Sequence, residues 1–132
     1  MRPRVTTLVL VTSLLAAAGC ARAQESASVD LTGGWTGYVI MGNGTRADLV
    51  MELTQSANGY TGVLRGTDET IPEMQLRNIE FVGDSLTFEF DFPSGHGLEL
   101  IRVRLRYSDE ALTGSYTDPT GDSDRMHFQR RD

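Results

Sequence analysis

From residue 31 onward, apolar and polar residues alternate with a period of two, which is the pattern of β-strands that bury one face. In residues 86–92, leucine and phenylalanine alternate with threonine, glutamate and aspartate. In residues 101–107, arginines separate the apolar residues. No stretch shows the apolar spacing of three to four residues that an amphipathic helix requires. The predicted strands are residues 33–41, 46–55, 59–66, 69–74, 76–82, 85–92, 97–107, 111–117 and 123–130.

Short turns link these strands into hairpins, and each turn predicts a register that brings apolar residues together. Asn58-Gly59 is the dipeptide favoured in type I′ turns, and Gly83-Asp84 and Asp109-Glu110 are two further candidate turns. The pairs predicted around these turns are Leu53 with Leu64, Phe81 with Leu86, Ile79 with Phe88, Tyr107 with Leu112, and Leu105 with Gly114.

Two segments depart from the regular pattern. Leu98 is in phase with Leu100, but Ile101 then takes over the inward face, so a β-bulge is predicted near Leu100-Ile101. In residues 69–74, Pro72 lacks a backbone donor, so this segment is either an edge strand or a short turn of helix. The predicted bulge would set Phe88 opposite Val103 and Glu89 opposite Arg102.

Eight or nine strands joined by short hairpins predict an all-β domain over residues 31–132. A sheet of this size removes its exposed edges by closing on itself. We therefore predict a single antiparallel up-and-down β-barrel of about eight strands. A two-sheet sandwich is the alternative, and the absence of long crossover connections in the sequence disfavours it.

Residues 1–23 have the layout of a secretory signal peptide, in which Arg2 and Arg4 precede an apolar run at residues 5–18. The run is shorter than the roughly 20 apolar residues of a membrane-spanning helix. Ala21-Arg22-Ala23 is a site for ordinary signal peptidase, with cleavage before residue 24. Residues 24–30 are small and polar, and we expect them to form a flexible tether.

A second cleavage site competes with the first. Residues 17–20 resemble a bacterial lipobox, which would end the signal at residue 19 and leave Cys20 as a lipidated N-terminus. Ala21 after the cysteine would then favour sorting to the outer membrane. Both alternatives predict an exported protein, either periplasmic or anchored to the outer membrane. Only the second leaves an attachment to a membrane, through the lipid on Cys20.

Composition narrows the chemistry that the chain can perform. The 132 residues carry 12 basic and 18 acidic side chains, and every basic residue is arginine. Removing 23 of 132 residues leaves 109, with nine arginines against 18 acids, which argues against nucleic-acid partners. The absence of lysine excludes lysine-based catalysis, and a single cysteine excludes an intrachain disulfide. We predict no cofactor and no metal.

The domain opens with Gly33-Gly34-Trp35, and this G-x-W resembles the signature of lipocalins and the wider calycin superfamily. In that group the tryptophan closes one end of the barrel and stacks on a basic residue near the last strand. The resemblance implies this role for Trp35, with Arg130 as its partner, or alternatively Arg125 or Arg131. Residues 31–37 also resemble the opening of avidin-like proteins, as do the T-G motifs at residues 61–62 and 113–114. We take these resemblances to imply the fold of this chain, and we do not take them to imply that it binds biotin.

The predicted function is that of an exported small β-barrel that binds a small apolar ligand. The alternative is an envelope protein-interaction module, inhibitor-like or accessory, with a filled barrel and no ligand. An eight-stranded barrel is just wide enough to be filled by side chains or to hold one small ligand. The aromatic residues expected to line or fill the interior are Trp35, Phe81, Phe88, Phe90, Tyr107 and Tyr116.

Other candidate chemistry has simpler interpretations. The arginines at 102, 104 and 106 could form an anion site, but a solvated strand face fits their spacing better. Residues 118–124 hold three carboxylates, which calcium could use, although acid-rich turns are common without metal. A Ser94-His96-Asp91 triad can be assembled only by proximity in sequence. We therefore predict no catalytic residues and no enzyme activity.

Overall fold

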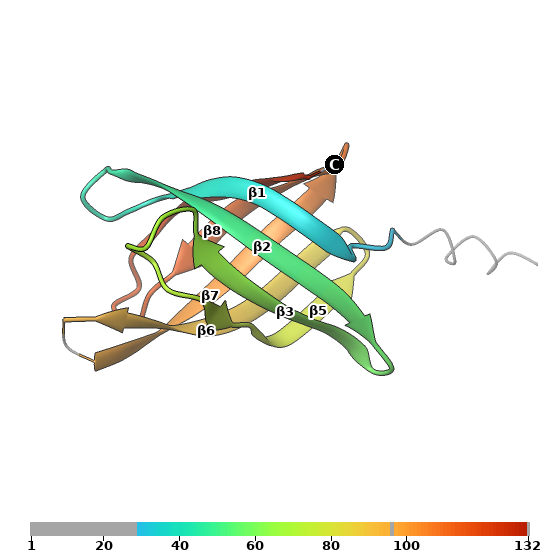
Figure 1. The fold of residues 1–132 in the computed structure, drawn as a ribbon, viewed down its shortest axis with the longest axis horizontal. Coiled ribbons are helices and arrows are strands. Elements are labelled where there is room, and N and C mark those ends of the chain that lie inside the picture. The colour runs from blue at the N-terminus through green and yellow to red at the C-terminus, as the bar shows by residue number, and fades with distance from the viewer. Residues whose placement is uncertain (1–28, 96, 132) are drawn as a thin grey trace, which may run out of the picture.

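A computed structural model describes residues 29–95 and 97–131, which form nine antiparallel strands wound into a nearly closed barrel (Figure 1). The predicted signal peptide, the candidate lipidation site Cys20 and tether residues 24–28 lie outside the described residues. The strands are β1 (Gly33–Ile40), β2 (Arg46–Ser56), β3 (Gly59–Gly66), β4 (Met74–Gln75), β5 (Arg77–Val82), β6 (Ser85–Ser94), β7 (Gly97–Ser108), β8 (Ala111–Thr117) and β9 (Ser123–Arg130).

The barrel closes through one short segment that changes neighbours. The strand order is β4-β3-β2-β1-β9-β8-β7-β6-β5, so β4 and β5 are the two ends of the sheet and consecutive in sequence. β4 pairs with β3, β5 pairs with β6, and between them Leu76 N–H donates to the Gly62 carbonyl at 2.9 Å. The all-β, up-and-down architecture is confirmed, with nine strands instead of about eight.

The predicted hairpin registers hold at two turns and fail at the third. Phe81 pairs with Leu86, and Tyr107 pairs with Leu112, as predicted. The pairing of Leu53 with Leu64 is wrong: the turn is formed by residues 57–58, and Leu64 pairs with Met51. Gly59, with φ of 139°, begins β3 instead of occupying the turn, which shifts the register by two and so preserves the faces.

The bulge predicted near Leu100-Ile101 is also wrong. β6 and β7 pair without interruption from Ser85–Arg106 to Ser94–Gly97, which includes the predicted opposition of Glu89 and Arg102. The hairpin projects beyond the barrel core, so alternation there no longer has to place apolar residues inside. Leu98 points outward and is 72% exposed.

The irregularity lies in β5 instead. The pairing of β5 with β6 shifts between Arg77 and Glu80, and Asn78 takes a positive φ of 52°. The pairing predicted for Ile79 with Phe88 falls within this bulge. The strand predicted at residues 69–74 is reduced to β4, because residues 67–73 form a loop in which Ile71 O accepts a hydrogen bond from Gly66 N.

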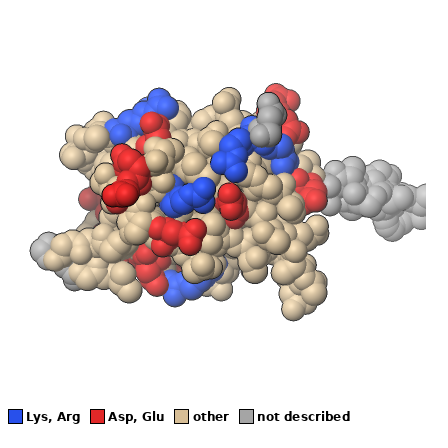
Figure 2. Space-filling view, viewed as in Figure 1, with Lys and Arg blue, Asp and Glu red and all other residues tan. Residues whose placement is uncertain are grey.

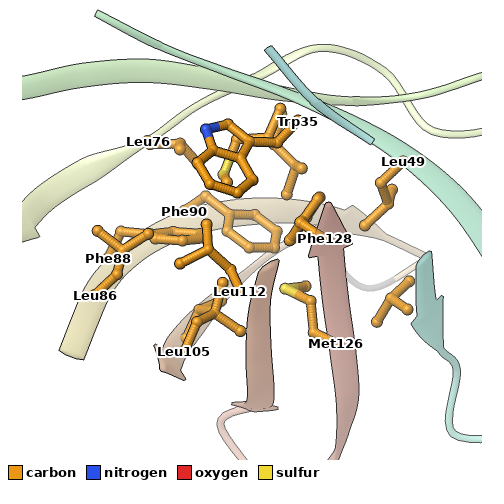
Figure 3. Close-up of a cluster of buried hydrophobic side chains, with 14 of the residues drawn as sticks. Trp35, Leu49, Leu76, Leu86, Phe88, Phe90, Leu105, Leu112, Met126 and Phe128 are labelled. Atoms are coloured by element: carbon orange, nitrogen blue, oxygen red, sulfur yellow. The ribbon is translucent and has the colours of Figure 1, made fainter. Parts of the chain in front are cut away.

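The inward-facing side chains form one apolar core inside the barrel (Figure 3). Those fully buried are Leu31, Trp35, Met51, Leu53, Leu64, Leu86, Phe88, Leu105, Leu112, Met126 and Phe128.

Candidate functional site

One end of the barrel is sealed around Trp35. The indole is fully buried, and its Nε1–H donates to the Leu31 carbonyl at 3.0 Å. The Arg130 guanidinium lies over the indole ring, 4.5 Å from its centroid. Arg130 also donates to the carbonyls of Asp30 at 3.0 Å and Thr32 at 3.2 Å. These bonds hold the entering chain across the barrel end.

The opposite end opens into a cavity of about 180 Å³. The walls come from every strand except β5, together with the loops that follow β1, β3 and β8. The lining residues are Val39, Met41, Gly42, Leu49, Leu64, Ile71, Met74, Phe90, Phe92, Glu99, Ile101, Tyr116, Asp118 and Met126.

The floor and walls of this cavity are almost entirely apolar. Phe90 and Ile101 form one side, where they pair across β6 and β7. Met41, Met74 and Met126 supply flexible thioether side chains, which adapt to ligands of different shape. An apolar cavity of roughly 150 Å³ stays dry and binds benzene, so the space in this barrel is large enough for one ring or a short alkyl chain.

Two carboxylates stand at the mouth of the cavity. On β7, Glu99 is in phase with Ile101 and so belongs to the inward row. Asp118 follows β8 and is in phase with Tyr116. Hydrogen bonds from Thr120, first from its hydroxyl, hold the pKa of the Asp118 carboxyl below its usual range. Asp118 therefore stays anionic at neutral pH.

Tyr116 bridges the wall and the mouth. Its hydroxyl donates to the Ile40 carbonyl at 2.8 Å, which ties β8 to the end of β1. Burial raises the pKa of the Tyr116 phenol, and the negative charges of Asp124, Asp118 and Asp122 raise it further. The negative field of this loop thus reaches a side chain that lines the cavity.

The structure separates the six aromatic residues proposed for the interior. Phe90 and Tyr116 line the cavity. Trp35 and Phe88 belong to the filled core, and each is exposed by 1% or less. Phe81 and Tyr107 are partly buried against that core. The prediction missed the remaining cavity residues, which are one further aromatic residue, Phe92, together with Gly42 and aliphatic, methionine and acidic residues.

Glu99 was missed for a specific reason. The bulge predicted at Leu100-Ile101 would have turned Leu98 and Leu100 inward, and so Glu99 outward. The uninterrupted β6–β7 pairing reverses this, because Phe92 and Glu99 are cross-strand neighbours on the cavity side. A correct prediction of the β6–β7 register would have been enough to place Glu99 on the cavity side.

The outer wall carries charges of both signs, interspersed on the face shown in Figure 2. Arg102 pairs with Glu89 at 3.0 Å and Arg106 with Asp84 at 3.1 Å. Two of the three arginines of the candidate anion site therefore already have carboxylate partners.

The other candidate chemistry does not assemble in the described residues. Asp118 Oδ1 accepts bonds from Thr120 and Asp122 within its own loop. In residues 29–95 and 97–131, no three or more His, Cys, Asp or Glu side chains are grouped to hold a metal. Of the triad residues, Asp91 pairs with Arg77 at 2.9 Å, and His96 lies outside the described residues.

Comparison of the chain with protein-family models, with curated proteins and with solved structures found no match. In the part of the chain that the structure describes, no helix is long and apolar enough to cross a membrane.

Proposed function

We propose that this protein is an exported, lipocalin-like β-barrel that binds the apolar part of a small ligand at its open end. The apolar cavity of about 180 Å³ carries this proposal. Its volume lies below the about 300–1,000 Å³ of pockets that enclose a drug-sized molecule. The ligand is accordingly small, or inserts only a ring or a chain end.

The contrast between the two barrel ends supports the lipocalin-like interpretation. The Trp35–Arg130 contact seals one end, as the resemblance implies, and leaves the interior accessible from the other. Residues 1–23 are proposed to direct export, with either cleavage before residue 24 or lipidation at Cys20. The protein would then act in the periplasm or on the outer membrane.

Neutral apolar probes test the proposal directly. We expect toluene and 1-hexanol to produce saturable chemical-shift changes in the ¹⁵N-labelled chain, confined to residues around the cavity. Ile101→Phe extends a ring into the cavity and is expected to weaken binding at least tenfold. Leu100→Phe is the matched control, because it adds a ring to the same strand on the opposite face.

The test distinguishes a ligand carrier from a protein-interaction module. If Ile101→Phe loses its fold, Val39→Met provides a smaller filling of the same cavity. A folded protein that shows no saturable change with either probe would contradict ligand binding. It would favour the alternative of an envelope protein-interaction module.

A further inference from the structure

The inward rows of two neighbouring strands change from apolar to acidic at the same end of the barrel. Along β7 the row runs through Leu105, Val103 and Ile101 to Glu99. Along β8 it runs through Leu112 and Tyr116, and its continuation reaches Asp118. Because Val103 pairs with Tyr116, the two carboxylates end adjacent rows. An apolar site therefore has an acidic mouth on one side.

Acidic residues also dominate the loops around this mouth. The loop at residues 67–73 holds three carboxylates, and the loop at 118–122 holds two, while neither contains a basic residue. Arg46, at the start of β2, is paired with Asp48 at 3.0 Å and lies over the Tyr38 ring. In the described residues, no arginine lines the cavity.

The two carboxylates of the mouth differ in what they already bind. Asp118 Oδ1 is held by the amides and hydroxyl of its own loop. Glu99 has no hydrogen bond or ion pair within the part of the chain that the structure describes. Glu99 can therefore meet a donor group of a ligand without breaking an existing contact.

We propose that the cavity selects a small amphiphilic amine, whose apolar group enters the barrel and whose ammonium group lies at Glu99 and Asp118. This inference rests on the proposed binding function and names the ligand class. A carboxylate beside an apolar wall favours a cation over a neutral or anionic head, because the wall limits solvent screening. Burial raises the pKa of the Tyr116 phenol, and the negative charges of three nearby aspartates raise it further, which is consistent with a negative potential at the mouth.

Three probes with one alkyl chain isolate the head group: hexylammonium, 1-hexanol and hexanoate, titrated at pH 7 and low salt. We expect hexylammonium to bind about fivefold more tightly than 1-hexanol, and hexanoate more weakly than either. Raising the salt concentration should reduce the advantage of the amine. All three should shift resonances of the same apolar cavity residues.

Two substitutions assign the effect to the mouth. Glu99→Gln removes the charge at nearly constant size, and we expect it to abolish most of the advantage of the amine, measured as the ratio of the hexylammonium affinity to the 1-hexanol affinity of the same variant. Asp118→Asn should reduce the advantage in part, and it keeps an acceptor for its loop. Glu80→Gln, on β5 and outside the cavity, is the control that should retain the wild-type ratio.

The outcomes separate this inference from the proposed function. If 1-hexanol binds in the cavity but the amine binds no more tightly, or Glu99→Gln leaves the ratio unchanged, amine selection is wrong and apolar binding stands. If the amine shifts only the acidic loops, its binding is surface attraction and the inference is wrong. If no probe binds the folded protein, the proposed function itself is wrong.

Discussion

The Arg130 guanidinium covers the buried Trp35 indole at 4.5 Å and joins the last strand to the segment that enters the barrel. The same side chain donates to two carbonyls of that segment and forms an ion pair with Glu110. A cation over an indole contributes about 1 kcal/mol, and hydrogen bonds from a charged donor add to this. Arg130 therefore holds together the closed end of the barrel, opposite the cavity.

Arg130→Ala should lower the free energy of unfolding by about 2 kcal/mol, because the ring loses its cover and two carbonyls lose a donor. The free energy of unfolding of Arg130→Lys should lie between those of the wild type and Arg130→Ala, since lysine keeps the charge but not the planar fork. Urea unfolding measures both. Arg131→Ala is the control: Arg131 pairs with Glu52 at 3.4 Å, is 44% exposed, and should cost less than about 1 kcal/mol.

If Arg130→Ala and Arg131→Ala lowered the free energy of unfolding equally, this result would contradict a special role for the contact between Arg130 and Trp35. The cavity at the opposite end provides a second readout. Because the sealed end is distant from the cavity, Arg130→Lys should leave the affinity for 1-hexanol unchanged. A change in that affinity would show that the two ends are coupled.

Strand positions could be predicted from the sequence because each half-buried strand repeats the same two-residue pattern. The pattern fails where that constraint ends. In the projecting β6–β7 hairpin no core enforces alternation, so Leu98 lies outside and Glu99 inside. The bulge at Asn78 left no hydrophobic signature, because the side-chain contact that Asn78 makes there, with Glu89, is polar.

The candidate site was harder to predict than the fold. Inward aromatics are equally suited to filling a barrel and to lining a cavity, and Phe88 does the first while Phe90 does the second. Which of the two occurs depends on depth along the barrel axis. That depth follows from strand register and barrel closure, which local sequence patterns specify only at some turns.

Two inward glycines allow neighbouring backbones to approach closely. A Cβ at Gly37 would lie 1.8 Å from the His127 carbonyl oxygen, and one at Gly114 would lie 2.0 Å from that of Arg104. Gly37→Ala must therefore move β9 away from β1. We expect a loss of about 3 kcal/mol in unfolding free energy, measured by urea denaturation.

Gly95→Ala is the matched control, because a Cβ there meets open space and the backbone needs no positive φ. It should change stability by less than about 0.5 kcal/mol. Similar losses at residues 37 and 95 would show that the β1–β9 contact is looser than the structure indicates.

The turn between β7 and β8 holds two non-glycine residues in left-handed conformations, with φ of 51° at Asp109 and 64° at Glu110. Glycine adopts this conformation without steric cost, so Asp109→Gly should raise stability by about 0.5 kcal/mol. Glu110→Gly relieves the same strain but removes the carboxylate that pairs with Arg130. We expect thermal unfolding to show a gain at residue 109 and none at residue 110.

Glu89 links the β5 bulge to the barrel wall and should make stability depend on acid pH. It accepts hydrogen bonds from Asn78 at 2.6 Å and Arg102 at 3.0 Å. The Asn78 bond, and next the Arg102 bond, lower the pKa of the Glu89 carboxyl. A carboxyl whose pKa is lower in the folded state stabilises the fold above its unfolded pKa of about 4.3. This contribution is lost as pH falls from there through the folded pKa.

A double-mutant cycle isolates this contribution. Asn78→Gly removes the donor but keeps the positive φ, and Glu89→Gln removes the charge at nearly constant size. Urea unfolding of the two single variants and the double variant should give a favourable coupling between residues 78 and 89 at pH 7. The coupling should disappear at pH values low enough to protonate Glu89 in the folded state. A coupling of the same size at both pH values would mean that shape, and not the carboxylate charge, holds the bulge in register.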